Sequence, residues 1–232
     1  KNKKFQNQTG CIMKVVAIIP IKQNSKRVKG KNFKLINKKP LYRYLLDKLK
    51  YAKFDEIYVD SDSKIIERYC KSKNYKFIKR LPNLKKDTAN GNDLLNYHAK
   101  IIKADIYFQL FVTAPLLKLS SINKCIDFLK KNKKYDSILT SKQIYSWFWF
   151  KDKPVNYNPK ILPRSQDARP IVVETTGLYG IKKNAIKKQR CRIGKKPFFY
   201  KVSEEESLDI DNSEDIKSLK YHVKNNLRSS NS

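Results

Sequence analysis

The chain runs from VVAIIPI at residues 15–21 directly into KQNSKRVKGKN at residues 22–32. The first segment is an apolar run typical of a buried strand, and the second is a polar loop in which five of eleven residues are cationic. A strand that opens into such a loop and then a helix gathers backbone N–H groups, a helix N-terminus and ammonium groups around one point. That arrangement suits a polyphosphate, although a solvated lysine-rich turn is an alternative interpretation. The loop contains neither GxxxxGK[ST] nor GxGxxG, so the common nucleotide motifs do not account for it.

The rest of the chain alternates between the two periodicities of strands and helices. Apolar runs predict strands at residues 15–20, 56–60, 76–79, 106–112, 137–140, 171–181 and 198–202. Helical spacing of apolar residues predicts helices at residues 40–52, 64–73, 92–103, 121–133 and 213–225. Strand–helix repetition favours right-handed crossovers and a mostly parallel sheet flanked by helices. In such a sheet the ligand lies at the carboxyl ends of the strands, where the loop at residues 22–32 falls.

Length and composition are those of a globular α/β protein. The 232 residues suffice for one domain with a substantial core, and the hydrophobic content is 40%. The formal charge of +31 is a pattern seen in nucleic-acid-binding proteins. The lysines are spread over every predicted element instead of forming one stripe, so we expect no specific nucleic-acid partner. A basic field also favours a nucleoside triphosphate and a sugar carboxylate as substrates.

The cysteines and the terminal segments bound the cellular context. Cys11, Cys70, Cys125 and Cys191 are far apart, form no CxxC pair and have no adjacent histidine, which predicts reduced cytoplasmic thiols and no zinc site. No apolar stretch approaches the roughly 18 residues of a membrane span. Residues 1–12 precede Met13 and are expected to be an N-terminal extension, while residues 226–232 are expected to be a polar tail.

The segment SLDIDNSED at residues 207–215 carries the most informative carboxylates. Asp209 and Asp211 alternate with Leu208 and Ile210, so in an extended backbone both carboxylates point to one side. Mg²⁺ prefers one or two carboxylates together with substrate phosphates and water. The alternative interpretation makes residues 211–213 a helix cap, and both roles are compatible.

Together these segments resemble the acylneuraminate cytidylyltransferases, which activate sialic acids and related nine-carbon sugar acids as CMP conjugates. The resemblance covers residues 13–225, and its first motif is carried by Gln23, Asn24, Ser25, Lys26, Lys31 and Asn32. It implies a three-layer Rossmann-like nucleotidyltransferase fold with a mostly parallel sheet. It also implies a homodimer formed through a small arm at about residues 141–165. The aromatic run at residues 147–150 fits burial either in a lobe or in that dimer contact.

The resemblance also implies a CTP site. Its second motif places Arg80 before Asp87, Thr88 and Ala89, where the family borders the cytosine. Asp62 matches a family aspartate, although a helix cap explains it equally well. The implied catalytic residues are Lys22, Lys31 and Asp211, and the implied metal ligands for Mg²⁺ are Asp209 and Asp211. The implied CTP-binding residues are Pro20, Ile21, Lys22, Asn24, Ser25, Lys26, Lys31, Asn32, Arg80, Asp87, Ala89 and Asn90.

A third set of residues is implied to hold the sugar acid. Arg164 suits its carboxylate because a guanidinium can make a two-point contact. Phe198 and Phe199 align with an apolar pair that faces the acyl group, although an aromatic pair in a strand is equally well explained as core. The full implied set is Phe111, Thr113, Arg164, Gln166, Glu174, Tyr179, Phe198 and Phe199.

Two positions depart from the family pattern. Lys22 stands where close relatives have Arg, which keeps the charge but loses the bidentate fork. Phe111 stands where many relatives have Gln, and a phenyl ring cannot replace the hydrogen bonds of an amide. The orientation of the acceptor must therefore be set differently in this chain.

The sequence thus predicts a cytidylyltransferase that joins CMP from CTP to a nine-carbon 2-keto sugar acid of the N-acylneuraminate, legionaminate or pseudaminate type. Two alternatives stay open: transfer to another acceptor, or a catalytically impaired relative that binds polyanions. The general base is open between metal-bound hydroxide and Asp211. The prediction requires the early lysines and the late aspartates to meet across one cleft.

Overall fold

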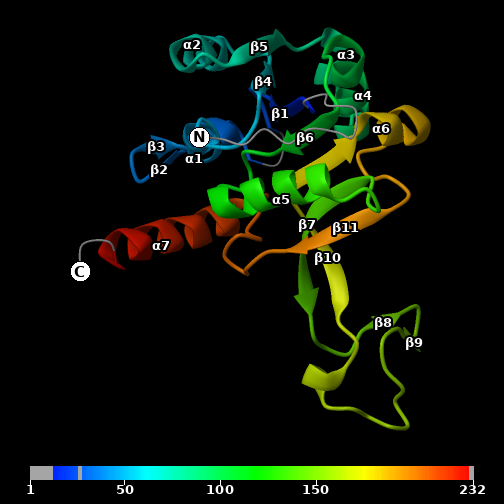
Figure 1. Ribbon diagram of the computed structural model, residues 1–232. Helices are drawn as coiled ribbons and strands as arrows, with labels where there is room; N and C mark the ends of the chain where they lie inside the picture. Colours follow the sequence, from blue (N-terminus) through cyan, green and yellow to red (C-terminus); the bar gives the residue numbers. More distant parts are fainter. Residues whose placement is uncertain (1–12, 26–27, 230–232) are drawn as a thin grey trace.

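The computed structural model describes residues 13–25 and 28–229, which alternate between strands and helices (Figure 1). The strands are β1 (Val15–Ile21), β2 (Leu35–Ile36), β3 (Lys39–Pro40), β4 (Glu56–Ser61), β5 (Lys76–Lys79), β6 (Ile106–Leu110), β7 (Ser137–Ile144), β8 (Trp149–Phe150), β9 (Lys153–Pro154), β10 (Ile171–Lys182) and β11 (Pro197–Lys201). The helices are α1 (Leu41–Leu49), α2 (Lys64–Lys73), α3 (Pro82–Lys85), α4 (Gly91–Ile101), α5 (Leu119–Lys131), α6 (Lys183–Gln189) and α7 (Ser213–Ser229), with the 3₁₀ turns η1 (Lys31–Phe33) and η2 (Ser165–Asp167).

The main sheet of the described residues has seven strands in the order β11-β7-β10-β6-β1-β4-β5. Strand β1 pairs in parallel with β4 and β6, β4 pairs in parallel with β5, and β11 pairs in parallel with β7. Strand β10 is antiparallel to both of its neighbours. The predicted mostly parallel sheet is therefore confirmed, and the parallel strands β1, β4 and β6 end at the same edge.

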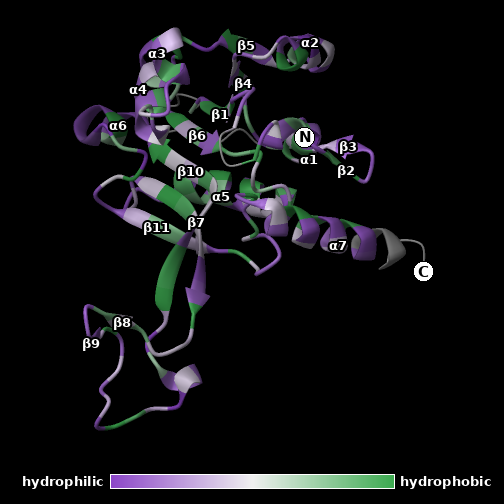
Figure 2. Cartoon of the chain, turned by 180° about the vertical axis from the view of Figure 1, so that it is seen from behind, coloured by the Kyte–Doolittle hydropathy of each residue, from purple (hydrophilic) through white to green (hydrophobic). Residues whose placement is uncertain are grey.

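Helices cover both faces of the sheet, because the parallel strands are apolar on both sides. One core cluster joins alternate residues of β1 to α1, α2 and α5. The other joins the intervening residues Val16 and Ile18 to α4 and α6. Figure 2 shows hydrophobic residues gathered on the central strands and hydrophilic residues along the outside of α7. The predicted three-layer α/β arrangement is confirmed.

The segment after β1 differs from the prediction. Between the loop and the predicted helix at residues 40–52, observed as α1, residues 31–33 form η1 and residues 35–40 form the β2–β3 hairpin, which the sequence did not predict. Asn37 and Lys38 have φ angles of 46° and 65°, which turn the chain back before Pro40 leads into α1. The expected helix N-terminus therefore does not lie at the end of the loop.

Strands β7 and β10 continue past their neighbours into an arm that projects from the body, and the small β8–β9 hairpin lies at its far end (Figure 1). The exposed fractions of Trp147, Trp149 and Phe150 are 41%, 57% and 68% in the single chain. Burial of this aromatic run within a lobe of the same chain, one of the two interpretations above, is therefore wrong. The predicted dimer contact stays a prediction.

The described cysteines are free thiols: Cys70 and Cys125 are buried and Cys191 is half-buried. Cys11 and the rest of the predicted N-terminal extension lie outside the described residues, as does the end of the polar tail. Among the helices in the described ranges, none combines the length and the apolar character that crossing a membrane requires.

Candidate active site

A cleft of about 430 Å³ opens at the carboxyl edge of β1 and β6. Most of the residues predicted to bind the nucleotide line it: Pro20, Lys22, Asn24, Ser25, Lys31, Asn32, Arg80, Asp87 and Ala89. Phe111 and Thr113, predicted to hold the acceptor, line the same cleft. Of the remaining three, Ile21 is fully buried in the core, Asn90 caps α4 with its side chain, and Lys26 lies outside the described residues.

The late aspartate segment lies against this cleft. The backbone N–H of Ile210 donates to the Thr113 carbonyl over 2.8 Å. Lys31, only 6% exposed, donates from Nζ to the Ile210 carbonyl, and its Nζ lies 3.4 Å from Asp211 Oδ1. One buried ammonium group thus joins the cleft to Asp211, so an early lysine meets one of the two late aspartates.

The loop after β1 is held by side chains from neighbouring segments. Asn32 Nδ2 donates to the Lys22 carbonyl over 2.8 Å, and the backbone N–H of Gln23 donates to Asp62 Oδ1 over 2.8 Å. Asp62 therefore holds the loop, while Ser63 accepts from Ile65 N as the cap of α2, so the interpretation of Asp62 as the cap is wrong. Lys22 Nζ lies 2.7 Å from Asp87 Oδ1, which holds this ammonium group at the cleft wall.

Arg80 lines the cleft, but most of its guanidinium is committed elsewhere. Its Nε donates to Asp60 Oδ1 and its Nη2 donates to the Asp60 carbonyl over 3.1 Å. His98 Nε2 lies 2.7 Å from the other carboxylate oxygen of Asp60, and all three side chains are buried. Burial raises the pKa of Asp60. The hydrogen bond with His98 and the charge of Arg80 together lower it by more than burial raises it, so the net pKa lies below the ordinary value of an aspartate. Nε and Nη2 of Arg80 are thus engaged with Asp60, and the predicted contact of Arg80 with CTP stays a prediction.

Asp209 and Asp211 keep carboxylate oxygens that the fold does not use as helix caps. Asn212 Oδ1 accepts from the N–H groups of Glu214 and Asp215, and the Asp215 carboxylate accepts from Asp211 N and Asn212 N. The cap is thus made by Asn212 and Asp215. Asp209 Oδ2 accepts from Thr176 Oγ1 over 2.5 Å.

The other oxygen of Asp209, Oδ1, is buried and has no hydrogen-bond partner among the described residues. A desolvated carboxylate oxygen without a donor is costly unless a cation completes it. No group of three or more metal-binding side chains occurs in the described ranges. Two carboxylates that leave the remaining positions to phosphates and water are what Mg²⁺ prefers, so the residues fit this ion.

Part of the predicted acceptor site lies beside the cleft on the α4–α6 face of the sheet. Register places Phe199, Leu139, Tyr179 and Gln109 in one row across β11, β7, β10 and β6, so their side chains share a face. Tyr179 donates from its hydroxyl to Glu174 Oε2 over 2.9 Å. Its ring meets that of Phe111 edge-on at a centroid distance of 6.4 Å. Burial raises the pKa of Tyr179, so the hydroxyl remains a donor.

The other predicted acceptor residues lie elsewhere. Arg164 and Gln166 are exposed in the arm, where Arg164 Nε lies 2.6 Å from Asp167 Oδ2. Phe198 stacks on Phe128 at a centroid distance of 4.0 Å and packs against the α5 side of the core. The prediction that Phe198 faces the acceptor is therefore wrong, because its place in β11 points it to the opposite face from Phe199.

Comparison with known proteins agrees with this geometry. The sequence model of the family described as cytidylyltransferase matches residues 16–227. The chain belongs to the cytidylyltransferase family. This confirms the family resemblance found in the sequence.

The individual relatives of this chain are distant. N-acylneuraminate cytidylyltransferase A of Danio rerio is 24% identical over 85% of this chain and 48% of its own length. A pseudaminic acid cytidylyltransferase and UDP-2,4-diacetamido-2,4,6-trideoxy-beta-L-altropyranose hydrolase of Helicobacter pylori is 24% identical over 85% of this chain and 40% of its own length. The chain thus spans about half or less of these curated relatives.

Among solved structures, CMP:2-keto-3-deoxy-manno-octonic acid synthetase complexed with CTP superposes with a TM-score of 0.68. That alignment covers 92% of this chain and 99% of the other, at 15% identity. At this identity the likeness shows the fold alone, and it confirms the predicted nucleotidyltransferase fold of this chain.

Lys48 supports the turn that carries Thr113 into the cleft. Its Nζ donates to the carbonyls of Pro115 and Leu117 over 2.9 and 2.7 Å. Burial lowers the pKa of Lys48 to about 8, and the charge of Lys39 lowers it further. The folded state therefore disfavours the charged form of this lysine.

We expect the Lys48 contribution to stability to rise with pH. Below about pH 8 both states hold the proton and folding carries the full desolvation cost, whereas between about 8 and 10.5 the unfolded chain binds more protons. The unfolding free energy of wild type, measured relative to that of Lys48→Met, should rise by about 1–3 kcal/mol from pH 7 to pH 10. Urea denaturation at several pH values measures it. The control variant is Lys50→Met, because Lys50 is exposed. If the effect of Lys48→Met on the unfolding free energy changes with pH no more than the effect of Lys50→Met does, the expectation is wrong.

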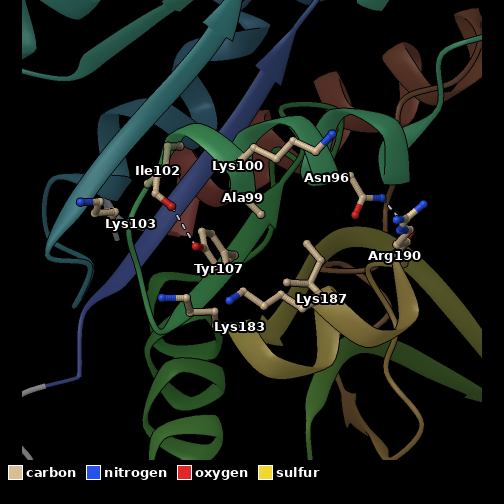
Figure 3. Close-up of a pocket in the computed structure, with 10 residues that line it drawn as sticks. Asn96, Ala99, Lys100, Ile102, Lys103, Tyr107, Lys183, Lys187 and Arg190 are labelled. Atoms are coloured by element: carbon tan, nitrogen blue, oxygen red, sulfur yellow. Dashed lines mark hydrogen bonds between the residues drawn. The ribbon is translucent and has the colours of Figure 1, made fainter.

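A second hollow of about 480 Å³ lies between α4 and α6 (Figure 3). Lysine side chains and Arg190 surround an apolar floor that includes Ile102 and Tyr107. None of the residues predicted from sequence for the cytidylyltransferase reaction lines it.

Sequence reasoning missed several residues of the cleft and its surroundings. Gln109 carried a detectable signal, since it is the polar residue in the apolar strand IYFQL. Asp60 and His98 are distant in sequence, and Lys48 and Arg192 are two cations among the 52 lysines and arginines of the chain. No spacing rule in the sequence distinguishes Lys48 and Arg192 from the cations of the surface.

Proposed function

We propose that this chain catalyses transfer of CMP from CTP to the anomeric hydroxyl of a nine-carbon 2-keto sugar acid, with release of pyrophosphate. The observation that carries the proposal is the joining of the nucleotide cleft to the Asp209–Asp211 segment through Lys31 in a member of the cytidylyltransferase family. The names of two relatives support a sialic-acid-type acceptor.

The residues around the cleft suit an in-line displacement. The anomeric hydroxyl gives its proton to the general base, for which Asp211 is a candidate, and its oxygen forms a bond to the α-phosphorus. The bond from that phosphorus to the bridging oxygen breaks, and the electron pair leaves with pyrophosphate. Positioning and charge neutralisation carry most of such a transfer. Lys22 and Lys31 supply positive charge from the cleft wall and floor, and Lys26 is proposed to join them.

Asp209 and Asp211 are proposed to hold Mg²⁺. Bound there, the ion would neutralise phosphate charge that two lysines alone leave uncompensated. Ile210, which lies between them, is buried and its N–H donates to the Thr113 carbonyl, so the backbone that carries both aspartates is fixed beside the cleft.

We further propose that the enzyme acts as a homodimer in the cytoplasm, where CTP is supplied. The arm exposes large apolar side chains, including Trp149, Phe150 and Ile161, and such patches usually mark interfaces. Sedimentation measurements on wild type and on a Trp149→Ser/Phe150→Ser variant test this part of the proposal.

The function is tested by incubating the full chain with CTP, Mg²⁺ and single acceptors, followed by mass spectrometry of the nucleotide products. The panel contains N-acetylneuraminate, legionaminate, pseudaminate, an eight-carbon keto acid and a sugar phosphate. We expect a CMP conjugate of at least one nine-carbon acid, and none with ATP, GTP or UTP. A product with only the eight-carbon acid or the sugar phosphate would overturn the proposed acceptor. No product at all, with DNA binding that survives physiological salt, would favour the polyanion-binding alternative.

A further inference from the structure

Arg192 holds its guanidinium beside the acceptor residues, stacked on an aromatic ring and without a carboxylate partner among the described residues. It lies in the loop between α6 and β11, and its Cζ stands 3.7 Å above the ring centroid of Tyr179 and 5.8 Å from that of Phe111. Within the described ranges, no carboxylate lies within 4 Å of it and no acceptor receives a hydrogen bond from its side chain. A stacked guanidinium keeps its donor edge available for a ligand.

The surrounding structure fixes Arg192 in this position. Its backbone N–H donates to Asn92 Oδ1 over 2.9 Å, which ties the loop to the first turn of α4. Gly91 leaves room for the side chain, because a Cβ added there would stand 2.8 Å from Arg192 Nη1. The N-terminal end of a helix favours anions over cations, so the helix dipole does not explain why a guanidinium lies here.

The place of Arg192 connects the cleft to the acceptor face. Phe111 lines the cleft, and Tyr179 lies in the cross-sheet row with Gln109 and Phe199. Gln109 Oε1 is buried, has no hydrogen-bond partner among the described residues, and would lie 3.4 Å from the same added Cβ at Gly91. An amide oxygen without a hydrogen-bond partner and a guanidinium without a carboxylate partner among the described residues therefore lie close together.

We propose that Arg192 binds the carboxylate of the sugar acid and so sets the orientation of the acceptor. This inference rests on the proposed function. It gives Arg192, from the same chain as the cleft, the role that the sequence assigned to Arg164. The two-point geometry of guanidinium and carboxylate supplies the directional contact that the phenyl ring of Phe111 lacks. The stacked ring of Tyr179 holds the guanidinium in place before the acceptor arrives, which lowers the ordering cost of binding.

Steady-state kinetics with the best acceptor of the panel test this assignment. Arg192→Gln is expected to raise the acceptor KM roughly 10- to 100-fold, since hydrogen bonds to charged groups are worth that much, while kcat and the KM for CTP stay near wild type. Arg192→Lys keeps the charge and should show a smaller rise. Arg190→Gln is the matched control, because it removes the same charge two residues away in the second hollow (Figure 3).

Gly91→Ala moves the guanidinium without removing it, and alanine favours the helix, so the fold is retained. It should also raise the acceptor KM. An acceptor whose carboxylate is converted to the amide separates a direct contact from a structural one: wild type should prefer the acid strongly, and Arg192→Gln should show little preference.

Different outcomes overturn different proposals. If wild type forms product but Arg192→Gln has an unchanged acceptor KM, or loses acid and amide acceptors equally, the assignment of Arg192 is wrong. If Arg164→Gln alone removes the preference for the acid, the carboxylate contact belongs to the arm. If wild type forms no CMP conjugate, the proposed function fails, and the assignment of Arg192 falls with it.

Discussion

Replacing Lys31 by methionine is expected to lower kcat for CMP transfer by about 10²- to 10³-fold, the cost of removing one preorganised charge donor from a transition state. The ammonium group is buried and lies between the nucleotide cleft and Asp211. A desolvated cation acts on developing charge more strongly than an exposed one, because the surrounding dielectric is lower. Methionine retains most of the length of the side chain, so the variant removes the charge with little loss of packing.

Loss of the Lys31 hydrogen bond to the Ile210 carbonyl also affects stability, so folding must be measured separately. Urea denaturation of Lys31→Met establishes that the protein is folded at the assay temperature. Lys29→Met is the matched control, because Lys29 is an exposed lysine two residues earlier in the same loop. Wild-type kcat in a folded Lys31→Met protein, or an equal loss in Lys29→Met, would show that Lys31 has no part in catalysis.

The sequence predicted the fold well where structure follows from local periodicity. Residues 15–21 form a strand because an apolar run of this length buries both faces of a parallel sheet, and the shorter apolar segments within residues 56–61 and 76–79 were sufficient to place β4 and the edge strand β5. The Lys64–Lys73 helix was placed at its exact bounds because Ser63 caps it and Asn74 ends it in the left-handed region, at φ 56°. Local chemistry was sufficient in these segments.

Prediction was weaker where structure depends on partners distant in sequence. The antiparallel setting of β10 leaves no mark in its own residues, since its hydrophobic pattern fits either direction. The opposite fates of Phe198 and Phe199 follow from the period of two in a strand, but the face that holds the core is set by α5. The β2–β3 hairpin depends on Asn37 and Lys38, two non-glycine residues with positive φ. The residue types alone do not predict that backbone conformation.

The candidate site shows the same division. Asn24, Ser25, Lys31 and Asn32 of the first motif line the cleft, and they could be placed there because they belong to one loop that follows a strand. Arg80 was also placed at the cleft, but its pairing with Asp60 and His98 could not be foreseen, because those residues belong to β4 and α4. Arg192 can be recognised as a candidate site residue only in the folded structure, where its guanidinium stacks on Tyr179.

Asp209→Asn is expected to lower kcat at least as much as loss of Lys31, by about 10²- to 10³-fold or more, since a metal Lewis acid contributes several kcal/mol. Asparagine has nearly the same shape and can still accept the hydrogen bond from Thr176, so the change removes the negative charge alone. Asp209 is a sharper probe than Asp211, because the Asp211 carboxylate also faces Lys31. Pyrophosphate release measured over a wide range of Mg²⁺ concentrations gives both kcat and the Mg²⁺ requirement.

Measurements of stability distinguish a metal-binding role of Asp209 from a purely structural role. Asp209 Oδ1 is buried without a donor, so the carboxylate opposes folding when no cation is bound, and Asp209→Asn should leave the protein as stable as wild type or more stable. Addition of Mg²⁺ with CTP should raise the Tm of wild type more than that of the variant. Glu214→Gln, which alters an exposed carboxylate five residues later, should behave as wild type in both assays. A destabilised Asp209→Asn protein with an undiminished response to Mg²⁺ would make Asp209 a structural residue and would leave the metal to be held elsewhere.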